Sequence, residues 1–244
     1  MIKSLSIIFP LYNESKRLKY CFQNINKFNT NSKIKNLEYI FVDDGSLDES
    51  YNLILDFIKK EKKKNKKIKY KAIKFKKNKG KGAALICGIK NASKDWMVTI
   101  DTDISVSLIE INNWIKYKYL KIDKQIYFGS RNLKDSIIKF EYHRKLIGFF
   151  FMLICKFLLK IKLHDTQCGF KLYKKKIGKM LFKNLTEKKF AHDIEIVLLA
   201  TKKKIEIIEL PVEWKHKEDS KIHLIKDSLS IFWSIYKMKK KFNY

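Results

Sequence analysis

Cysteine is scarce and widely spaced in this sequence of 244 residues. The four cysteines are Cys21, Cys87, Cys155 and Cys168. No two of them form a C-x-x-C pair, the spacing typical of zinc sites, and they lack the density of small disulfide-bonded domains. We therefore expect neither a zinc site nor a disulfide framework, and a reducing compartment fits best.

Long apolar runs are missing as well. Residues 5–11 are apolar, but they include Pro10 and lead directly into a polar Asn-Glu pair, which is unlike a signal peptide. Residues 146–159 are nearly all apolar, yet Lys156 interrupts them and the run is shorter than the ~20 residues that a membrane-spanning helix needs. We expect no signal peptide and no transmembrane segment.

Acidic residues are few. The sequence has 25 Asp and Glu and 54 Lys and Arg, which gives a net charge of +29. Such an excess favours anionic partners, namely nucleic acid, phosphorylated ligands or an anionic membrane. Many lysines occur in runs such as residues 62–64 and 202–204, which are typical of a solvated surface. A nucleic-acid-binding protein is the competing class, but no such motif is present, so we expect no specific nucleic acid partner.

No linker rich in Pro, Gly or Ser divides the chain, and 45% apolar residues are enough for one core. Short runs rich in Ile, Val, Phe and Tyr alternate with longer helical patterns, which predicts βαβ units and a mainly parallel sheet. The predicted strands are residues 5–10, 37–43, 68–75, 96–101, 125–128 and 205–211. The predicted helices are residues 14–28, 48–60, 83–91, 191–202 and 222–242.

The last predicted helix is amphipathic and ends in the basic run KMKKK at residues 237–241. Its apolar face consists of Ile222, Ile225, Leu229, Phe232 and Tyr236. We predict a catalytic domain at residues 1–218, with an interfacial segment at about 140–163, and a C-terminal basic helix at 219–244. Apolar faces edged with lysine suit peripheral contact with an anionic membrane surface.

Carboxylates follow two of the predicted strands. The DDGS motif at residues 43–46 can accept hydrogen bonds from a ribose or a base, or it is an ordinary turn that caps the next helix through its serine or through Asp48. Asp101 and Asp103 follow the fourth strand, and their oxygens suit Mg²⁺ or Mn²⁺ with positions left for substrate phosphates. Because D-x-D is common, its context has to decide.

A glycine turn and two arginines are candidates for phosphate binding. The NKGKG turn at residues 78–82 precedes a helix, so its amides and Lys81 can hold an anion, or it is a turn with surface lysines. Only three of the 54 basic residues are arginine, and arginine gives the planar, multidentate grip that phosphate favours. We therefore favour Arg131 and Arg144 as phosphate ligands over members of surface ion pairs.

Two later stretches offer further polar groups. The loop DTQCGFK at residues 165–171 suits the wall of a site for a polar ligand, or equally a tight turn with Cys168 and Phe170 in the core. Asp193 and Glu195 lie two apart on a predicted helix, so they cannot face the same way. At most one of these two carboxylates can point into a site.

Along residues 4–235, six motifs in this order resemble family 2 glycosyltransferases of the GT-A fold. They are IIFPLYNE at 7–14, VDDGS at 42–46, GKG at 80–82, DTD at 101–103, GSR at 129–131 and DTQCGFK at 165–171. This α/β fold has a Rossmann-like, mainly parallel central sheet flanked by helices, here with peripheral amphipathic helices for a membrane interface. The DTQCGFK loop, PVEW at 211–214 and SKI at 220–222 resemble the polyprenyl-phosphate branch, which includes the dolichyl-phosphate β-glucosyltransferases. The resemblance implies a nucleotide-sugar donor, a divalent metal, an inverting displacement and a lipid phosphate acceptor.

The resemblance also assigns roles by position. The donor nucleotide would be held by Pro10, Tyr12, Glu14, Asp43 and Asp44, with Lys81 adding charge. The metal ion would be held by Asp101 and by Asp103, the more direct ligand. The acceptor phosphate would be held by Arg131 and Arg144. The sugar pocket would be lined by Asp165 and Gln167.

A phosphate acceptor is already an anion at neutral pH, so it requires no strong general base. The alternative is a glycan hydroxyl acceptor, for which Asp193 or Glu195 would be the base. Ser105 stands where mannose-transferring relatives can carry a glutamine, so we expect glucose from UDP-glucose ahead of mannose from GDP-mannose. The expected location is the cytoplasm, peripheral on the cytosolic face of a membrane.

Overall fold

The computed structural model describes residues 2–139, 157–189, 191–215 and 224–242. In the last helix the side chains are described from Trp233 onward. Arg144 and most of the predicted interfacial segment lie outside the described residues.

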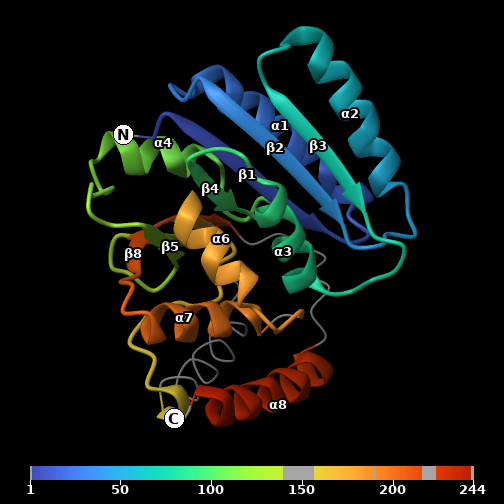
Figure 1. The fold of residues 1–244 in the computed structure, drawn as a ribbon. Coiled ribbons are helices and arrows are strands. Elements are labelled where there is room, and N and C mark those ends of the chain that lie inside the picture. The colour runs from blue at the N-terminus through green and yellow to red at the C-terminus, as the bar shows by residue number, and fades with distance from the viewer. Residues whose placement is uncertain (1, 140–156, 190, 216–223, 243–244) are drawn as a thin grey trace.

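A central sheet carries helices on both of its faces (Figure 1). The strands are β1 (Ser4–Leu11), β2 (Asn36–Asp43), β3 (Lys69–Lys74), β4 (Trp96–Thr99), β5 (Ile126–Ser130), β6 (Ile137–Lys139), β7 (Lys171–Lys174), β8 (Ile208–Pro211) and β9 (Glu213–Lys215). The helices are α1 (Ser15–Asn31), α2 (Ser50–Lys64), α3 (Lys81–Asn91), α4 (Ile109–Lys116), α6 (Lys175–Lys183), α7 (His192–Lys202) and α8 (Leu224–Phe242).

The central sheet has seven strands in the order β3-β2-β1-β4-β7-β5-β8. Neighbouring strands are parallel, except that β7 runs antiparallel to both β4 and β5. A second, two-stranded sheet pairs β6 with β9. The mainly parallel α/β sheet predicted from the sequence is therefore confirmed, and each of the six predicted strands is present.

The elements that the sequence patterns did not predict are short. Strands β6 and β9 have 3 residues each, which is too few for a period-2 pattern to be recognised. Strand β7 has the sequence KLYK, and its lysines hide the signal of a central strand even though Lys171 is buried. Helices α4 and α6 have only 8 and 9 residues.

Strand β1 shows why the sheet needs helices on both sides. All of its residues are buried, and successive side chains point to opposite faces. Leu5, Ile7 and Phe9 pack with residues of α1, α2 and α4, whereas Ile8 packs with residues of α3, α6 and α7. Figure 1 shows α3 and α6 in front of the sheet. Because β1 pairs parallel with both β2 and β4, these three strands end at one common edge of the sheet.

Helix α8 lies beside α7 and has two different faces (Figure 1). Ile235 and Met238 are buried in the same core cluster as the residues of α7. Tyr236, which was predicted on the apolar face, is 56% exposed and stacks on Trp233 with ring centroids 5.6 Å apart. Across the described part of the chain, no helix combines the length and apolar character that crossing a bilayer requires.

A buried carboxylate organises the opposite, amino-terminal end of the sheet. Glu38 accepts hydrogen bonds from Ser6 Oγ at 2.6 Å and from Ser93 N and Oγ at 2.8 and 3.1 Å, and it pairs with Lys71 Nζ at 2.9 Å. Although burial acts in the opposite sense, these donors lower the pKa of Glu38. Its stabilisation is thus present above the unfolded pKa of ~4.3 and is lost as the pH falls through the folded pKa.

Replacing Glu38 with Gln should lower the free energy of unfolding by about 2 kcal/mol, because an amide nitrogen would then face the donors of Ser93 and Lys71. Urea denaturation measures this change, and below about pH 4.3 the difference from the wild type should shrink. Glu49→Gln, at an exposed position before α2, is the control and should change stability by less than about 0.5 kcal/mol. Equal stability of Glu38→Gln and wild type at neutral pH would contradict this account.

Candidate active site

The DDGS carboxylates at the end of β2 have different partners. Asp43 Oδ1 accepts the N–H of Ser46 at 2.8 Å. Its Oδ2 is buried without a hydrogen bond from the described residues, and Lys74 Nζ is 3.9 Å away. Asp44 accepts the N–H groups of Lys79 and Gly80 at 2.7 and 2.8 Å, while burial raises its pKa. Asp43 therefore keeps an unused acceptor, whereas Asp44 holds the glycine turn.

The glycine turn is shaped by a close approach of two backbones. Gly80 has φ 101°, and a Cβ there would lie 2.4 Å from the carbonyl oxygen of Lys188; at Gly82 a Cβ would lie 2.6 Å from that of Glu187. Ala83 N also donates to Lys188 O at 3.1 Å. The glycines thus serve packing, and the anion that meets the turn's amides is the carboxylate of Asp44 in the same chain.

The Asp101-Thr102-Asp103 turn follows β4. Asp101 Oδ1 pairs with Lys81 Nζ at 2.6 Å, and Gly169 lies so close that a Cβ there would be 2.3 Å from Asp101 Oδ2. Asp103 Oδ1 accepts the N–H of Ser105 at 2.8 Å. The turn therefore brings the glycine turn, β4 and the loop at 165–171 together around two carboxylates.

These two carboxylates fit a divalent cation. Burial, followed by the neighbouring charge of Asp101, raises the pKa of Asp103, so the pair repel each other when both are ionised and a cation would relieve that repulsion. Among the residues whose placement is described, no group of three or more His, Cys, Asp or Glu is arranged to hold a metal. Further ligands would come from phosphate oxygens and water, as is usual for Mg²⁺.

Arg131, after β5, is held by a bidentate ion pair with Asp165. Its Nε and Nη2 donate to the two carboxylate oxygens at 2.6 and 2.9 Å, and its backbone N–H donates at 3.0 Å. The same carboxylate accepts the N–H groups of Gln167 and Cys168 at 2.9 and 3.2 Å. Asp165 is 1% exposed, so its closest partner is Arg131 and its predicted contact with a sugar remains a prediction.

Comparison with known proteins places this chain in a family. A model described as glycosyl transferase family 2 matches residues 6–182. This chain belongs to that family. It is 31% identical over 244 residues to the dolichyl-phosphate beta-glucosyltransferase of Dictyostelium discoideum, covering 96% of this chain and 73% of that protein. The human dolichyl-phosphate beta-glucosyltransferase is 29% identical over 252 residues, with coverage of 98% and 73%.

Solved structures have the same fold. Glucosyl-3-phosphoglycerate synthase from Mycobacterium tuberculosis, in complex with UDP, superposes with a TM-score of 0.67 at 14% identity, covering 96% of this chain and 79% of that one. A mannosyltransferase from Pyrobaculum calidifontis, in complex with GDP-Man and Mn²⁺, gives 0.57 at 15% identity, with coverage of 91% and 59%. At such identities the likeness concerns the fold alone, and it confirms the expected GT-A architecture.

In this family 2 glycosyltransferase, the two carboxylates of α7 face different partners, as their spacing predicted. Asp193 is buried, pairs with Lys171 Nζ and lies 3.2 Å from His192 Nε2. Although burial acts the other way, His192 and Lys171 hold the pKa of Asp193 well below its usual range. Glu195 instead pairs with Lys241 of α8 at 2.6 Å. Of the two carboxylates, Asp193 is the one whose charge also raises the pKa of Lys81, and its place in the site remains a prediction.

Arg17, the third arginine, was not among the predicted site residues. In the first turn of α1, its Nε and Nη2 bind Glu14 at 2.5 and 2.6 Å, and its charge counteracts the rise in the pKa of Asp103. The scarcity that drew attention to Arg131 and Arg144 applied equally to this residue. Glu14, predicted to hold the nucleotide, is thus ion-paired at the edge of the site.

Electrostatic effects connect six of the predicted site residues. Burial opposes the charged form of Lys81, but Asp101, Asp193 and Asp103 together raise its pKa. Burial also opposes the charged form of Arg131, but Asp165 and, to a smaller extent, Asp101 raise its pKa. The other predicted residues that the structure describes belong to β1, to the end of β2 and to loops. Pro10 pairs with Val42 in the sheet, Tyr12 is 36% exposed, Gln167 is half-buried, and Arg144 lies outside the described residues.

The Arg131–Asp165 pair should show strong energetic coupling. In a double-mutant cycle with Arg131→Lys and Asp165→Asn, the free energies of unfolding should be non-additive by about 2 kcal/mol. Lys cannot replace the bidentate fork, and Asn cannot balance the charge of the guanidinium. Chemical denaturation of the four proteins measures the coupling.

The control cycle uses the ion pair of Lys124 with Glu206, whose side chains are 25% and 60% exposed. Its coupling should stay below about 1 kcal/mol because solvent screens the charges. Additive effects at Arg131 and Asp165 would show that the pair does not act as a unit.

Proposed function

We propose that this protein is an inverting glycosyltransferase that moves glucose from UDP-glucose to a polyprenyl or dolichyl phosphate, using Mg²⁺ or Mn²⁺. The observation that carries the proposal is similarity to dolichyl-phosphate beta-glucosyltransferases over 96% of the chain. The relative of that name from Saccharomyces cerevisiae extends the similarity, with 29% identity over 93% of the chain. The charges around the site support the proposal on the donor side and on the acceptor side.

On the donor side, the described groups suit a nucleoside diphosphate. Asp101 and Asp103 would hold the metal ion, which when bound supplies positive charge against the departing diphosphate. Lys81 lies at the same place with its ammonium 2.6 Å from Asp101 and would add a second positive charge. The unused Oδ2 of buried Asp43 would accept a hydrogen bond from the base or ribose, because a buried carboxylate oxygen without a donor is costly.

On the acceptor side, Arg131 is prepared to bind a phosphate. A guanidinium carries five N–H donors, and the side chain of Asp165 takes only the two on Nε and Nη2. The remaining donors can bind phosphate oxygens, and the bidentate pair holds the guanidinium plane in a fixed orientation. We propose that this orientation aligns the acceptor oxygen for in-line attack on the anomeric carbon.

The ionisation of α7 favours a phosphate acceptor over a hydroxyl. A hydroxyl acceptor needs a general base whose pKa lies near the working pH. Asp193 is ion-paired with Lys171 and has a strongly lowered pKa, and Glu195 is bound to Lys241 of α8. Neither carboxylate is suited to remove a proton, whereas a phosphate oxygen attacks as an anion. Asp193 then acts as the counter-ion of Lys171 and, through its charge, of Lys81.

Purified protein incubated with radiolabelled UDP-glucose, Mg²⁺ and a polyprenyl phosphate should form a glucosylated lipid phosphate. Asp103→Ala should lower the rate by at least about a hundredfold, because the metal ion that would bind the diphosphate loses one of its protein ligands. Removing the metal with a chelator should have the same effect on the wild type. Extraction of the labelled lipid and chromatography measure the product.

Asp56→Ala, an exposed position on α2, is the control and should keep the wild-type rate. Both variants should unfold at the wild-type temperature, which shows that lost transfer reflects chemistry and not folding. Folded wild-type protein that yields no lipid-linked product would refute the proposal. Transfer only from GDP-mannose, or only to a glycan hydroxyl, would replace its donor or its acceptor respectively.

We further propose that α8 attaches the protein to the cytosolic face of a membrane. Trp233 and Tyr236 are 58% and 56% exposed on one side of the helix, and Lys237 Nζ lies 5.6 Å from the centre of the Trp233 ring. Aromatic rings flanked by lysines suit the headgroup region, where the ring is buried and the ammonium stays near anionic lipid. The division into residues 1–218 and 219–244 remains a prediction of the sequence.

The double variant Trp233→Ala/Tyr236→Ala should bind vesicles of phosphatidylcholine and phosphatidylserine at least about tenfold more weakly, because burial of each ring contributes ~1.5–3 kcal/mol. Vesicle sedimentation measures this loss, and wild-type binding should weaken as salt rises. Tyr20→Ala, which removes a 56% exposed tyrosine on α1, is the control. Equal binding of all three proteins would exclude the exposed aromatic face of α8 as the membrane contact.

A further inference from the structure

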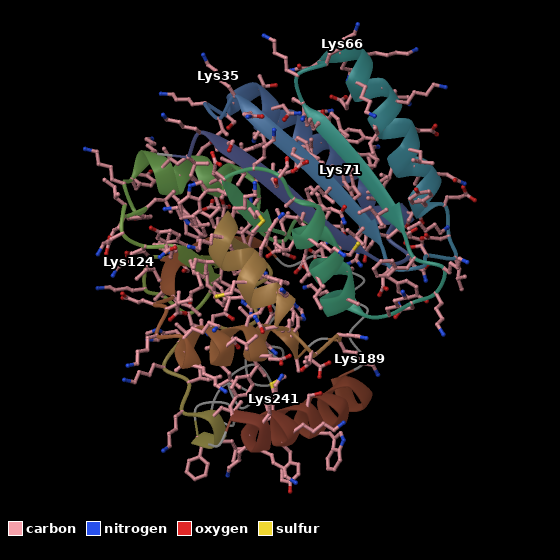
Figure 2. All side chains as sticks on the ribbon, viewed as in Figure 1. Lys35, Lys66, Lys71, Lys124, Lys189 and Lys241 are labelled. Atoms are coloured by element: carbon pink, nitrogen blue, oxygen red, sulfur yellow. The ribbon has the colours of Figure 1, made fainter. Side chains whose placement is uncertain are left out.

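One buried carboxylate, Glu195 on α7, ties helix α8 to the segment at residues 186–188. Its oxygens accept the N–H groups of Thr186 and Glu187 at 3.0 and 2.6 Å. Glu195 also accepts a hydrogen bond from the ammonium of Lys241 at 2.6 Å. In Figure 2, Lys241 lies between α7 and α8. Although burial acts in the opposite sense, these donors, led by Lys241, lower the pKa of Glu195. The carboxylate therefore stays charged and fixes both structures at one point.

The other side of segment 186–188 touches the glycine turn of the site. The missing side chains of Gly80 and Gly82 let the turn approach the carbonyl oxygens of Lys188 and Glu187. Ala83 N adds a hydrogen bond to Lys188 O at 3.1 Å. Two backbones in such close contact cannot move independently, because protein interiors transmit displacement where atoms are closely packed.

Lys81 stands between the two glycines, and its ammonium is 2.6 Å from Asp101. A shift of the turn would therefore change the distance between this ammonium and the carboxylates proposed to hold the metal. The contacts form a continuous series that runs from α8 through Glu195 and segment 186–188 to Lys81. Each step is a hydrogen bond, an ion pair or a backbone contact.

Packing alone does not fix α8 at this point. A cleft of about 220 Å³ lies beside the ion pair between α7 and α8, and Ser234, Lys237 and Met238 of α8 are among its lining residues. Met238 itself is buried in the core, but the cleft leaves open space beside it. The bonds from Lys241 to Glu195 and to Thr186 Oγ1 therefore add to the packing that holds this end of the helix.

We propose that Glu195 and Lys241 are positioning residues for the donor site, and that the seating of α8 sets the affinity for the nucleotide-sugar donor. The helix that we expect at the membrane surface is thereby connected to the turn that carries Lys81. The donor part of this inference rests on the proposed function. The mechanical part, in which loss of the Lys241 contact loosens the glycine turn, does not.

Hydrogen–deuterium exchange of the full-length protein tests the mechanical part without any substrate. In Lys241→Met, amides at residues 186–188 and at 80–84 should exchange faster than in the wild type, while β1 and β2 stay protected. Lys240→Met, at an exposed position of the same helix, is the matched control and should leave both segments unchanged. Faster exchange that stops at 186–188 would overturn the inference.

Steady-state kinetics with UDP-glucose and a short-chain prenyl phosphate in detergent test the donor part. Lys241→Met should raise the KM for UDP-glucose by about three- to tenfold and leave the KM for the prenyl phosphate unchanged. Lys241→Arg should restore the donor KM, because it keeps the charged bond to Glu195. In a Glu195→Gln background, Lys241→Met should have little further effect on the KM for UDP-glucose, since the ion pair is already broken.

A fall in kcat with both KM values unchanged would contradict a positioning role. If the wild type does not transfer glucose at all, the proposed function fails, whereas the exchange experiment still decides whether α8 is coupled to the glycine turn.

Discussion

Compensation of buried charge governs the carboxyl edge of the central sheet. An isolated charge in a protein interior is costly, and removal of one member of a buried pair leaves that cost uncompensated. The site uses cations from distant parts of the chain to meet this constraint. Three buried carboxylates are paired in this way, Asp165 with Arg131, Asp193 with Lys171 and Glu195 with Lys241. The partly exposed Asp101 pairs with Lys81. Each pair joins two segments of the chain, so these ion pairs also connect elements that are separate in the sequence.

The large lysine excess has a different meaning from these few pairs. Most lysines extend from the periphery into solvent, as Lys35 and Lys66 do in Figure 2. The surface interpretation of the lysine runs therefore agrees with the structure. Lys171 is the contrary case, because it is 1% exposed and its ammonium lies 4.8 Å from the ring centre of Phe128. Composition could not separate a buried lysine such as this one from the many solvated ones, since the difference lies in burial.

The sheet was predictable because its central strands are covered on both faces. Burial on both sides requires nearly continuous apolar runs, so residues 5–10 and 37–43 already marked the strands observed as β1 and β2. Strand β7 escaped prediction because its neighbours β4 and β5 supply the environment that buries its lysine and tyrosine. A pattern of four residues contains no record of those neighbours.

The members of the site were easier to predict than their partners. Polar residues at strand ends identified the carboxylates, but the pairing of Arg131 with Asp165 spans 34 positions in sequence, and no local pattern encodes it. The glycines at 80 and 82 drew attention for anion binding, which remains a prediction, and the structure adds their close contact with Glu187 and Lys188. The sequence therefore indicated where polar side chains follow the strands, whereas the partners of those side chains depended on the tertiary fold.

The loop at residues 165–171 offers little freedom for redesign of sugar preference. Asp165 is committed to Arg131, Cys168 is buried, and Gly169 has no room for a side chain beside Asp101. Gln167 is the half-buried member whose side chain is not used in this way. If this loop lines the sugar pocket as predicted from the sequence, redesign of the transferred sugar would have to begin at Gln167. Natural variation within the pocket would be expected to concentrate at the same position.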